Sequence, residues 1–164
     1  MITVGRMLYS SLGLAAALLV AGQVGLFAGQ PPTGLGPHGD RLLPPSDTPN
    51  SVSSQADLYP EHPQRLYALI EPFPLRQGDA AASLAALAAV LRTMPSITLV
   101  ESGPDYLRAE AQTRWLKFLD DLEFWFNPAS GVIELRSASR LGRKDFGENR
   151  RRVDAIRAAY LALP

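Results

Sequence analysis

The sequence contains no cysteine among its 164 residues. This absence excludes disulfide bonds, thiol nucleophiles, zinc sites built on thiolates and lipid anchors attached through a cysteine. It leaves the cellular compartment open, because a chain without thiols is insensitive to the redox state of its surroundings.

Histidine is also scarce, with only His38 and His62. Neither has a second ligand at the spacing of a metal site, so we expect both to be exposed to solvent, and we predict no metal and no other cofactor. The sequence shows no adjacent nucleophile and base and no phosphate-binding loop either. These absences favour a protein without enzymatic activity.

Neither sign of charge is in excess, since 16 basic and 16 acidic residues give a formal net charge of zero. A chain of this kind has no overall field that would draw it to nucleic acid, and we predict no nucleic-acid partner.

The N-terminus carries a long apolar run. Met7–Ala28 is a stretch of about 22 residues without a charged side chain, close to the roughly 20 that cross a bilayer as a helix. We expect an uncleaved transmembrane anchor. The alternative is a secretory signal peptide cut between Ala28 and Gly29, but its apolar region is usually only about 7–15 residues long. With Arg6 before the run, the positive-inside rule predicts a bacterial inner-membrane protein whose domain lies on the periplasmic side.

Glycine and proline make up nearly half of the next segment, residues 29–49. Such a composition buries too little apolar surface to offset the entropy of ordering, so we predict a semi-extended linker. The predicted organisation is therefore an anchor or signal segment (1–28), a linker (29–49) and one domain (50–164).

The first half of the predicted domain holds one strand and one helix before the main sheet. Leu66–Ile70 is a short apolar segment followed by prolines, which predicts an edge strand. Asp79 then precedes an alanine-rich stretch and is expected to cap a helix that ends at Pro95. Its buried stripe is predicted to contain Leu84, Leu87, Leu91 and Met94.

Alternating apolar residues predict strands over residues 97–100, 106–112, 121–126 and 132–140. Matching the apolar faces of the last two places Glu123 opposite Arg136, on the face away from Phe124 and Leu135. Asp145, followed by Glu148, predicts the start of a final helix. The fold class is α+β: a largely antiparallel sheet of four to five strands with two helices on one face, preceded by the transmembrane helix and the Pro/Gly linker.

Charged residues gather on the predicted hairpin, at Asp120, Asp121, Glu123 and Arg136. One interpretation is a solvent-facing set of cross-strand ion pairs. The other is that Asp121 and Glu123 form a carboxylate pair for acid–base chemistry or a divalent metal. We favour the ion pairs, because an opposed arginine neutralises such a pair readily.

The stretch Arg136–Arg152 brings arginines, serines and glycines to the junction of the last strand and the last helix. In one interpretation the arginines bind carbonyl groups and carboxylates and hold loop to helix. In the other, arginines, serine hydroxyls and helix N-terminal amides converge on a phosphate or carboxylate. Both interpretations stay open. The candidate polar or anion-binding residues are Arg136, Ser137, Ser139, Arg140, Asp145, Asn149, Arg150 and Arg152, with Asn50, Ser53 and Ser54 from a segment expected to pack over them.

Three segments together resemble the bacterial and plastid family called domain of unknown function 1499. They are Asn50-Ser-Val-Ser-Ser-Gln55, Phe118-Leu-Asp-Asp-Leu-Glu-Phe124, and Arg136-Ser-Ala-Ser-Arg140-x-Gly142-x-x-Asp145-x-Gly147-x-Asn149-Arg150-x-Arg152. The resemblance spans about Asp47 to Ala159 and implies no activity. Where family members commonly have a cysteine, this chain has Ser51. A function through that thiol is therefore excluded here, and Ser51 has no histidine near it in sequence to serve as a base.

Two classes of function follow. The first is a membrane-anchored, extracytoplasmic binding or accessory module that recognises an anionic small molecule or an envelope protein partner. The second is a hydrolase that uses Asp121 and Glu123 with Arg140. The first is favoured, and the two differ in whether the carboxylates open into a concave pocket or lie paired.

Overall fold

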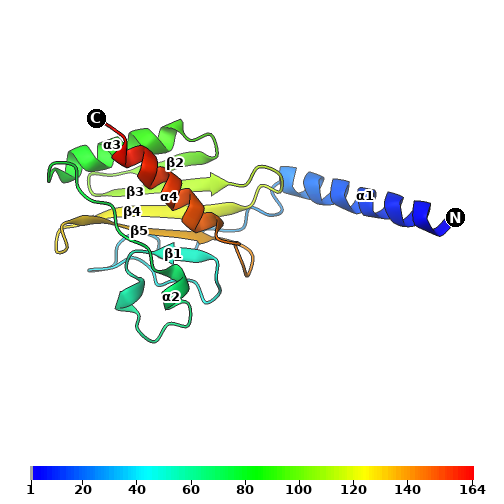
Figure 1. Ribbon diagram of the computed structural model, residues 1–164, viewed down its shortest axis with the longest axis horizontal. Helices are drawn as coiled ribbons and strands as arrows, with labels where there is room; N and C mark the ends of the chain where they lie inside the picture. Colours follow the sequence, from blue (N-terminus) through cyan, green and yellow to red (C-terminus); the bar gives the residue numbers. More distant parts are fainter. Residues whose placement is uncertain (1) are drawn as a thin grey trace.

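The computed structural model describes residues 2–164 and shows one α+β domain with a helix, α1, that extends away from it (Figure 1). Five strands form a single sheet, and two long helices, α3 and α4, lie across one of its faces. In chain order the elements are α1 (Ile2–Gln23), β1 (Ser51–Ser53), a 3₁₀ turn (Ala56–Leu58), α2 (Arg65–Ala68), α3 (Ala80–Thr93), β2 (Ile97–Ser102), β3 (Tyr106–Gln112), β4 (Leu119–Asn127), β5 (Val132–Ser139) and α4 (Glu148–Leu161).

The strands follow the order β1-β5-β4-β3-β2, with every neighbouring pair antiparallel. The hairpin register predicted from the sequence is confirmed, with Phe124 opposite Leu135 and Glu123 opposite Arg136. The period of two in a strand explains this result, because a slip by one residue would turn phenylalanines away from the core.

The core lies between the sheet and the two helices. Asp79 caps α3 by accepting a hydrogen bond from the Ala82 amide, as predicted. Leu87 and Leu91 of α3 are fully buried, as are Val153 and Ile156 of α4. These residues pack on the apolar face of the sheet, so the three- and four-residue spacing in each helix correctly identifies its buried side.

The expected spanning anchor is not supported. Within residues 2–164, no helix is both long enough and apolar enough to cross a membrane. The apolar run Met7–Ala28 is not one continuous helix, since α1 ends at Gln23 and the ring of Phe27 stacks on Phe118 at 5.1 Å. The last residues of the run therefore pack on the domain instead of extending the helix.

The predicted linker, residues 29–49, also differs from expectation, because it packs on the second face of the sheet. Leu42 is only 1% exposed and forms a small apolar cluster with Tyr106 and Trp125. The Gln55 side chain fixes the segment by accepting from the Leu42 amide at 2.8 Å and donating to the Asp40 carbonyl. This segment is therefore part of the domain.

The predicted edge strand at Leu66–Ile70 is wrong. Residues Arg65–Ala68 form the short helix α2, and Leu66 is 77% exposed. The edge position belongs to β1, to which the segment adds only one bridge, between Ser53 and Leu69. A short apolar run carries too few periods to distinguish a strand from a helical turn.

Candidate functional site

Asp145 organises the start of α4. Its carboxylate accepts hydrogen bonds from the amides of Gly147 (3.0 Å) and Asn149 (2.9 Å) and from the Tyr67 hydroxyl (2.5 Å). Burial opposes ionisation of this carboxyl group, but these hydrogen bonds outweigh it and lower its pKa. The predicted capping box is not formed, because α4 begins at Glu148 with Gly147 as its N-cap residue and the Glu148 side chain pairs with Arg151. Asp145 instead caps the helix from two residues before the N-cap, through the Asn149 amide.

Asn149 joins the helix start to β5 and to the residue that precedes the edge strand β1. Its fully buried amide donates to the Asn50 carbonyl at 3.0 Å and to the Ser139 hydroxyl at 3.1 Å, and it accepts from the Ser137 hydroxyl at 2.5 Å. Asn50 in turn donates to the Gly142 carbonyl. Asn50, the first residue of the segment Asn50–Gln55, therefore lies against the loop and helix start, as expected, whereas the rest of the segment binds elsewhere.

Ser53 and Ser54 take local roles further along this edge. The Ser53 hydroxyl accepts from the Gln55 amide at 3.2 Å. The Ser54 hydroxyl donates to Glu134 at 2.6 Å and accepts from the Leu135 amide. Both serines thus serve the pairing of the edge strand and lie outside the polar network around Asn149.

The arginines of the last motif bind groups of the protein itself. Arg140 forms two hydrogen bonds with Asp121, of 2.8 and 2.7 Å, and a third with Glu110 of 2.5 Å. Arg152 lies 2.7 Å from Asp120. Arg150 donates to the carbonyls of residues 67 and 69. These side chains hold strands, loop and helix together, which is the structural interpretation of the arginine block.

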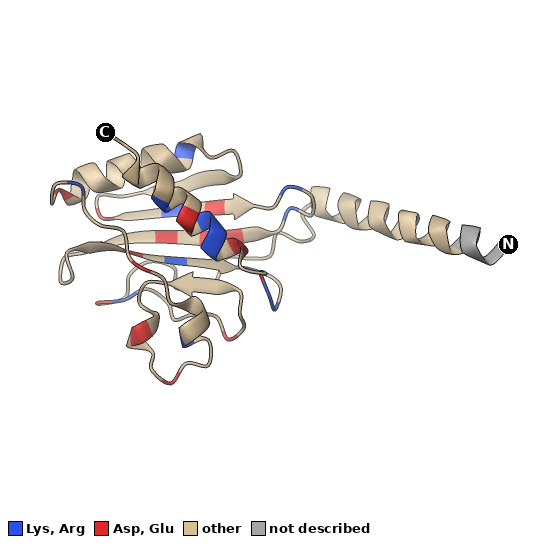
Figure 2. Cartoon of the chain, viewed as in Figure 1, with Lys and Arg blue, Asp and Glu red and all other residues tan. Residues whose placement is uncertain are grey.

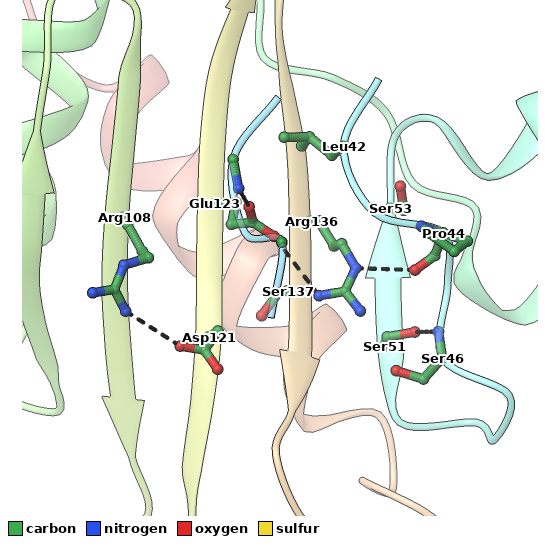
Figure 3. Close-up of polar contacts among 12 residues, drawn as sticks. Leu42, Pro44, Ser46, Ser51, Ser53, Arg108, Asp121, Glu123, Arg136 and Ser137 are labelled. Carbon is green, nitrogen blue, oxygen red and sulfur yellow. Dashed lines mark hydrogen bonds and ion pairs between the residues drawn. The ribbon is translucent and has the colours of Figure 1, made fainter. Parts of the chain in front are cut away.

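The second sheet face is buried, so the expectation of solvent-facing ion pairs is wrong. Glu123 has no exposed surface and Arg136 is 6% exposed, because residues 29–49 cover them. Gly36 donates its amide to Glu123 at 2.6 Å. Arg136 donates to the Pro44 carbonyl of the same covering segment at 3.1 Å (Figure 3). Burial lowers the pKa of Arg136 despite the nearby carboxylates.

The carboxylates of Asp121 and Glu123 are paired rather than presented to a substrate. Asp121 is 1% exposed and held by Arg140 and Arg108. Glu123 accepts from the Tyr106 hydroxyl at 2.9 Å, and its Oε2 lies 3.7 Å from Nη1 of Arg136. Burial and the neighbouring Glu123 carboxylate raise the pKa of Tyr106. Within residues 2–164 no group of three or more metal-ligating side chains is present.

A cleft of about 730 Å³ opens where the β3–β4 loop, the β5–α4 loop and the start of α4 meet. Three of the predicted site residues line it, namely Ser139, Asp145 and Arg152. Asn149 lies behind it, bonded to Ser139 and Asp145, whereas Arg136, Ser53 and Ser54 do not line it and bind groups elsewhere. The other lining residues are Ser96, Gln112, Thr113, Arg114, Phe118, Asp120, Leu141, Gly142, Lys144, Phe146, Glu148 and Arg151.

Ser51 has no catalytic surroundings in the described chain. It is 1% exposed and its hydroxyl accepts from the Ser46 amide at 2.8 Å. His38 contacts the Gly34 carbonyl, and His62 lies 3.7 Å from Asp47. Among the described residues neither histidine is bonded to Ser51.

Sequence reasoning missed several residues around the cleft. Tyr67 was assigned to a strand, so its bond to Asp145 was not expected. Trp115 and Phe146 are 64% and 84% exposed at the cleft end of the domain, and no periodic pattern identifies an exposed aromatic residue in a loop. Leu42 did carry a signal, since two adjacent leucines in a Pro/Gly segment are apolar enough to pack.

One family model matches the chain. It is described as "Protein of unknown function (DUF1499)" and covers residues 41–160. Its match begins inside the segment expected to be a linker, in agreement with the burial of Leu42. No curated protein and no solved structure matches the chain.

Proposed function

The chain belongs to the DUF1499 family of proteins of unknown function, and we propose that this member is a membrane-anchored binding module. In this proposal α1 holds the domain at the bacterial inner membrane, the domain lies on the extracytoplasmic side, and the cleft recognises an anionic group. That group belongs to a small molecule or to an envelope protein partner.

The charge of the cleft is the observation that carries the proposal. Arg114 and Lys144 are exposed, and neither has an ion pair among the described residues. Of the three acids that line the cleft, Asp120 pairs with Arg152 and Glu148 with Arg151, while Asp145 is an ionised carboxylate held by two amides and a hydroxyl. Four basic against three acidic lining residues leave a net positive charge, which favours a phosphate or carboxylate.

The surface of α1 supports the membrane part of the proposal. Met7, Leu8 and Tyr9 are consecutive and 72%, 69% and 77% exposed, and at about 100° per residue they spread apolar side chains over more than half of the helix circumference. A bilayer would cover this exposed apolar surface. Arg6, at the start of the helix, favours the cytoplasmic side for that end.

A thermal-shift series on the full chain in detergent tests the ligand. We expect at least one of inorganic phosphate, glycerol 3-phosphate and citrate to stabilise the protein, by about 2.7 kcal/mol at a hundredfold excess over its dissociation constant. The Lys144→Glu variant should lose this stabilisation. Arg92→Glu, an exposed arginine on α3, is the matched control and should keep it. No stabilisation by any of these anions, or an unchanged response of the Lys144 variant, contradicts an anion site in the cleft.

Protease accessibility tests the orientation. Protease added to spheroplasts should remove the domain while α1 stays with the membrane fraction. Protection of the domain in intact spheroplasts, with cleavage only after lysis, would reverse the orientation.

A further inference from the structure

Two loops lie at the end of the domain from which α1 departs (Figure 1). The first connects β3 to β4 (residues 113–118), and the second connects β5 to α4 (residues 140–147). Gln23 at the end of α1 donates to the Trp115 carbonyl, and a side-chain carbon on Gly22 would lie 2.6 Å from the Leu116 carbonyl oxygen. The same close approach occurs at Gly29, where a side chain would meet Leu141 at 3.0 Å. The chain leaving α1 is therefore seated against both loops.

Both loops present large apolar side chains to solvent. Trp115 is 64% exposed, Phe146 is 84% exposed and Leu141 is 41% exposed. The second tryptophan of the chain, Trp125, is only 5% exposed. Exposed aromatic residues gathered at one end of a domain indicate a surface that binds a membrane or another molecule.

The loop conformations hold these side chains outward. Lys117 and Phe146 are two of the three described non-glycine residues with positive φ, at 59° and 53°. Such backbone is strained and persists only where neighbouring contacts fix it. In the first loop Thr113 and Phe118 exchange two hydrogen bonds of 2.9 Å, and in the second Arg151 donates to the Phe146 carbonyl. The aromatic residues are thus presented on fixed loops.

The charge of the two loops indicates the kind of surface that they bind. Their fully exposed charged residues are all basic, namely Arg114, Arg143 and Lys144, and half-buried Lys117 adds a fourth basic side chain (Figure 2). Asp145 is the one acid in either loop, and its oxygens are occupied. Because the whole chain has a net charge of zero, this end is locally positive and the remainder of the chain carries a matching net negative charge.

We propose that these two loops form a docking surface for an anionic lipid bilayer, an inference that rests on the proposed anchoring by α1. Tryptophan and phenylalanine enter the headgroup level of a membrane, and lysine and arginine bind its phosphates. Since α1 leaves from the same end, its insertion brings both loops to the lipid surface. The cleft between them then opens toward the headgroups.

Tryptophan fluorescence of the full chain in lipid vesicles tests this docking. The vesicles contain brominated phosphatidylcholine, either alone or with 30% phosphatidylglycerol, a composition chosen so that only the second type is anionic. Trp115 is the exposed tryptophan and α1 contains none, so the difference between wild type and Trp115→Phe isolates its signal. We expect at least a twofold loss of Trp115 emission in the anionic vesicles and a clearly smaller loss in the neutral ones, where α1 inserts but the basic side chains find no anionic headgroups.

Charge variants complete the test. Arg143→Glu with Lys144→Glu should remove most of the quenching in anionic vesicles, whereas Arg92→Glu on α3 should leave it unchanged. Cosedimentation with the vesicles separates this inference from the anchor: binding without quenching of Trp115 overturns the docking surface and leaves anchoring intact. Quenching that survives the double charge reversal overturns the role of anionic lipid. Failure to sediment with either vesicle removes the anchor and the docking surface together.

Discussion

Arg140 gives the sharpest test of the structural role of the arginine block. Its side chain is 4% exposed, and the Asp121 carboxylate that it binds through two hydrogen bonds is 1% exposed. In Arg140→Ala the Asp121 carboxylate stays buried. Among the described residues, Arg108 at 3.6 Å is then the one cation that still pairs with it. Breaking a buried pair on one side costs about 3–5 kcal/mol. For a chain of this size, about 2–4 °C per kcal/mol predicts a melting temperature lower by roughly 6–20 °C.

Differential scanning calorimetry in detergent measures this change, with two companion variants. Arg143→Ala removes an exposed arginine from the same loop and should change the free energy of unfolding by at most about 0.5 kcal/mol. Arg140→Met combined with Asp121→Asn removes both charges and should recover part of the loss, since no uncompensated carboxylate remains. If Arg140→Ala lowers the free energy of unfolding by less than about 1 kcal/mol, the Arg140–Asp121 pair does not stabilise the fold. The interpretation of Arg140 as part of an anion site would then be favoured.

Further predictions concern the covering segment and the helix start. In chemical denaturation, Leu42→Ala should lower the free energy of unfolding by about 2–5 kcal/mol. Leu66→Ala should leave it nearly unchanged, because the Leu66 side chain is 77% exposed. Equal effects of the two substitutions would mean that residues 29–49 are a spacer. Asp145→Ala should cost about 0.5–2 kcal/mol by loss of the cap, and Tyr67→Phe a smaller part of that; a neutral Asp145→Ala result would contradict the capping geometry. The fold lowers the pKa of Asp145, so the stability that its carboxylate contributes is present above the unfolded pKa of about 3.9 and is lost as the pH falls below that value. The acid unfolding curves of wild type and Asp145→Asn should therefore converge toward about pH 2.

The sheet and its helices could be predicted because their patterns are long. Strands β3 and β4 each alternate over three apolar positions and β5 over two, and the register of the hairpin follows from placing Phe124 and Leu135 on one face. Asp79 sits directly before an alanine-rich stretch with a leucine every three or four residues, a combination that specifies both the start and the buried side of α3.

The burial of Glu123 and Arg136 could not be predicted by the same reasoning. Alternation in a strand separates two faces, but it does not say whether the polar face meets water or another segment. The covering segment has a composition that is typical of spacers, and it is fixed by backbone groups: the Gly36 amide on Glu123 and the Pro44 carbonyl on Arg136. Every segment has backbone donors and acceptors, so the residue types in a sequence do not indicate where such contacts form.

The last motif, Arg136–Arg152, has named and unnamed positions with different roles. This difference explains why the resemblance to the family indicates a fold but no ligand. The named residues face inward: Arg140 binds Asp121, Asn149 joins helix to strands, and Arg152 binds Asp120. The unnamed positions between them face outward, and most of those line the cleft. The two roles overlap at Ser139, Asp145 and Arg152, which bind groups of the protein and also line the cleft. Leu141, Lys144, Phe146, Glu148 and Arg151, at the motif's open positions, line the cleft as well, so under the proposed function they are the positions at which substitutions should change ligand preference with least effect on the fold.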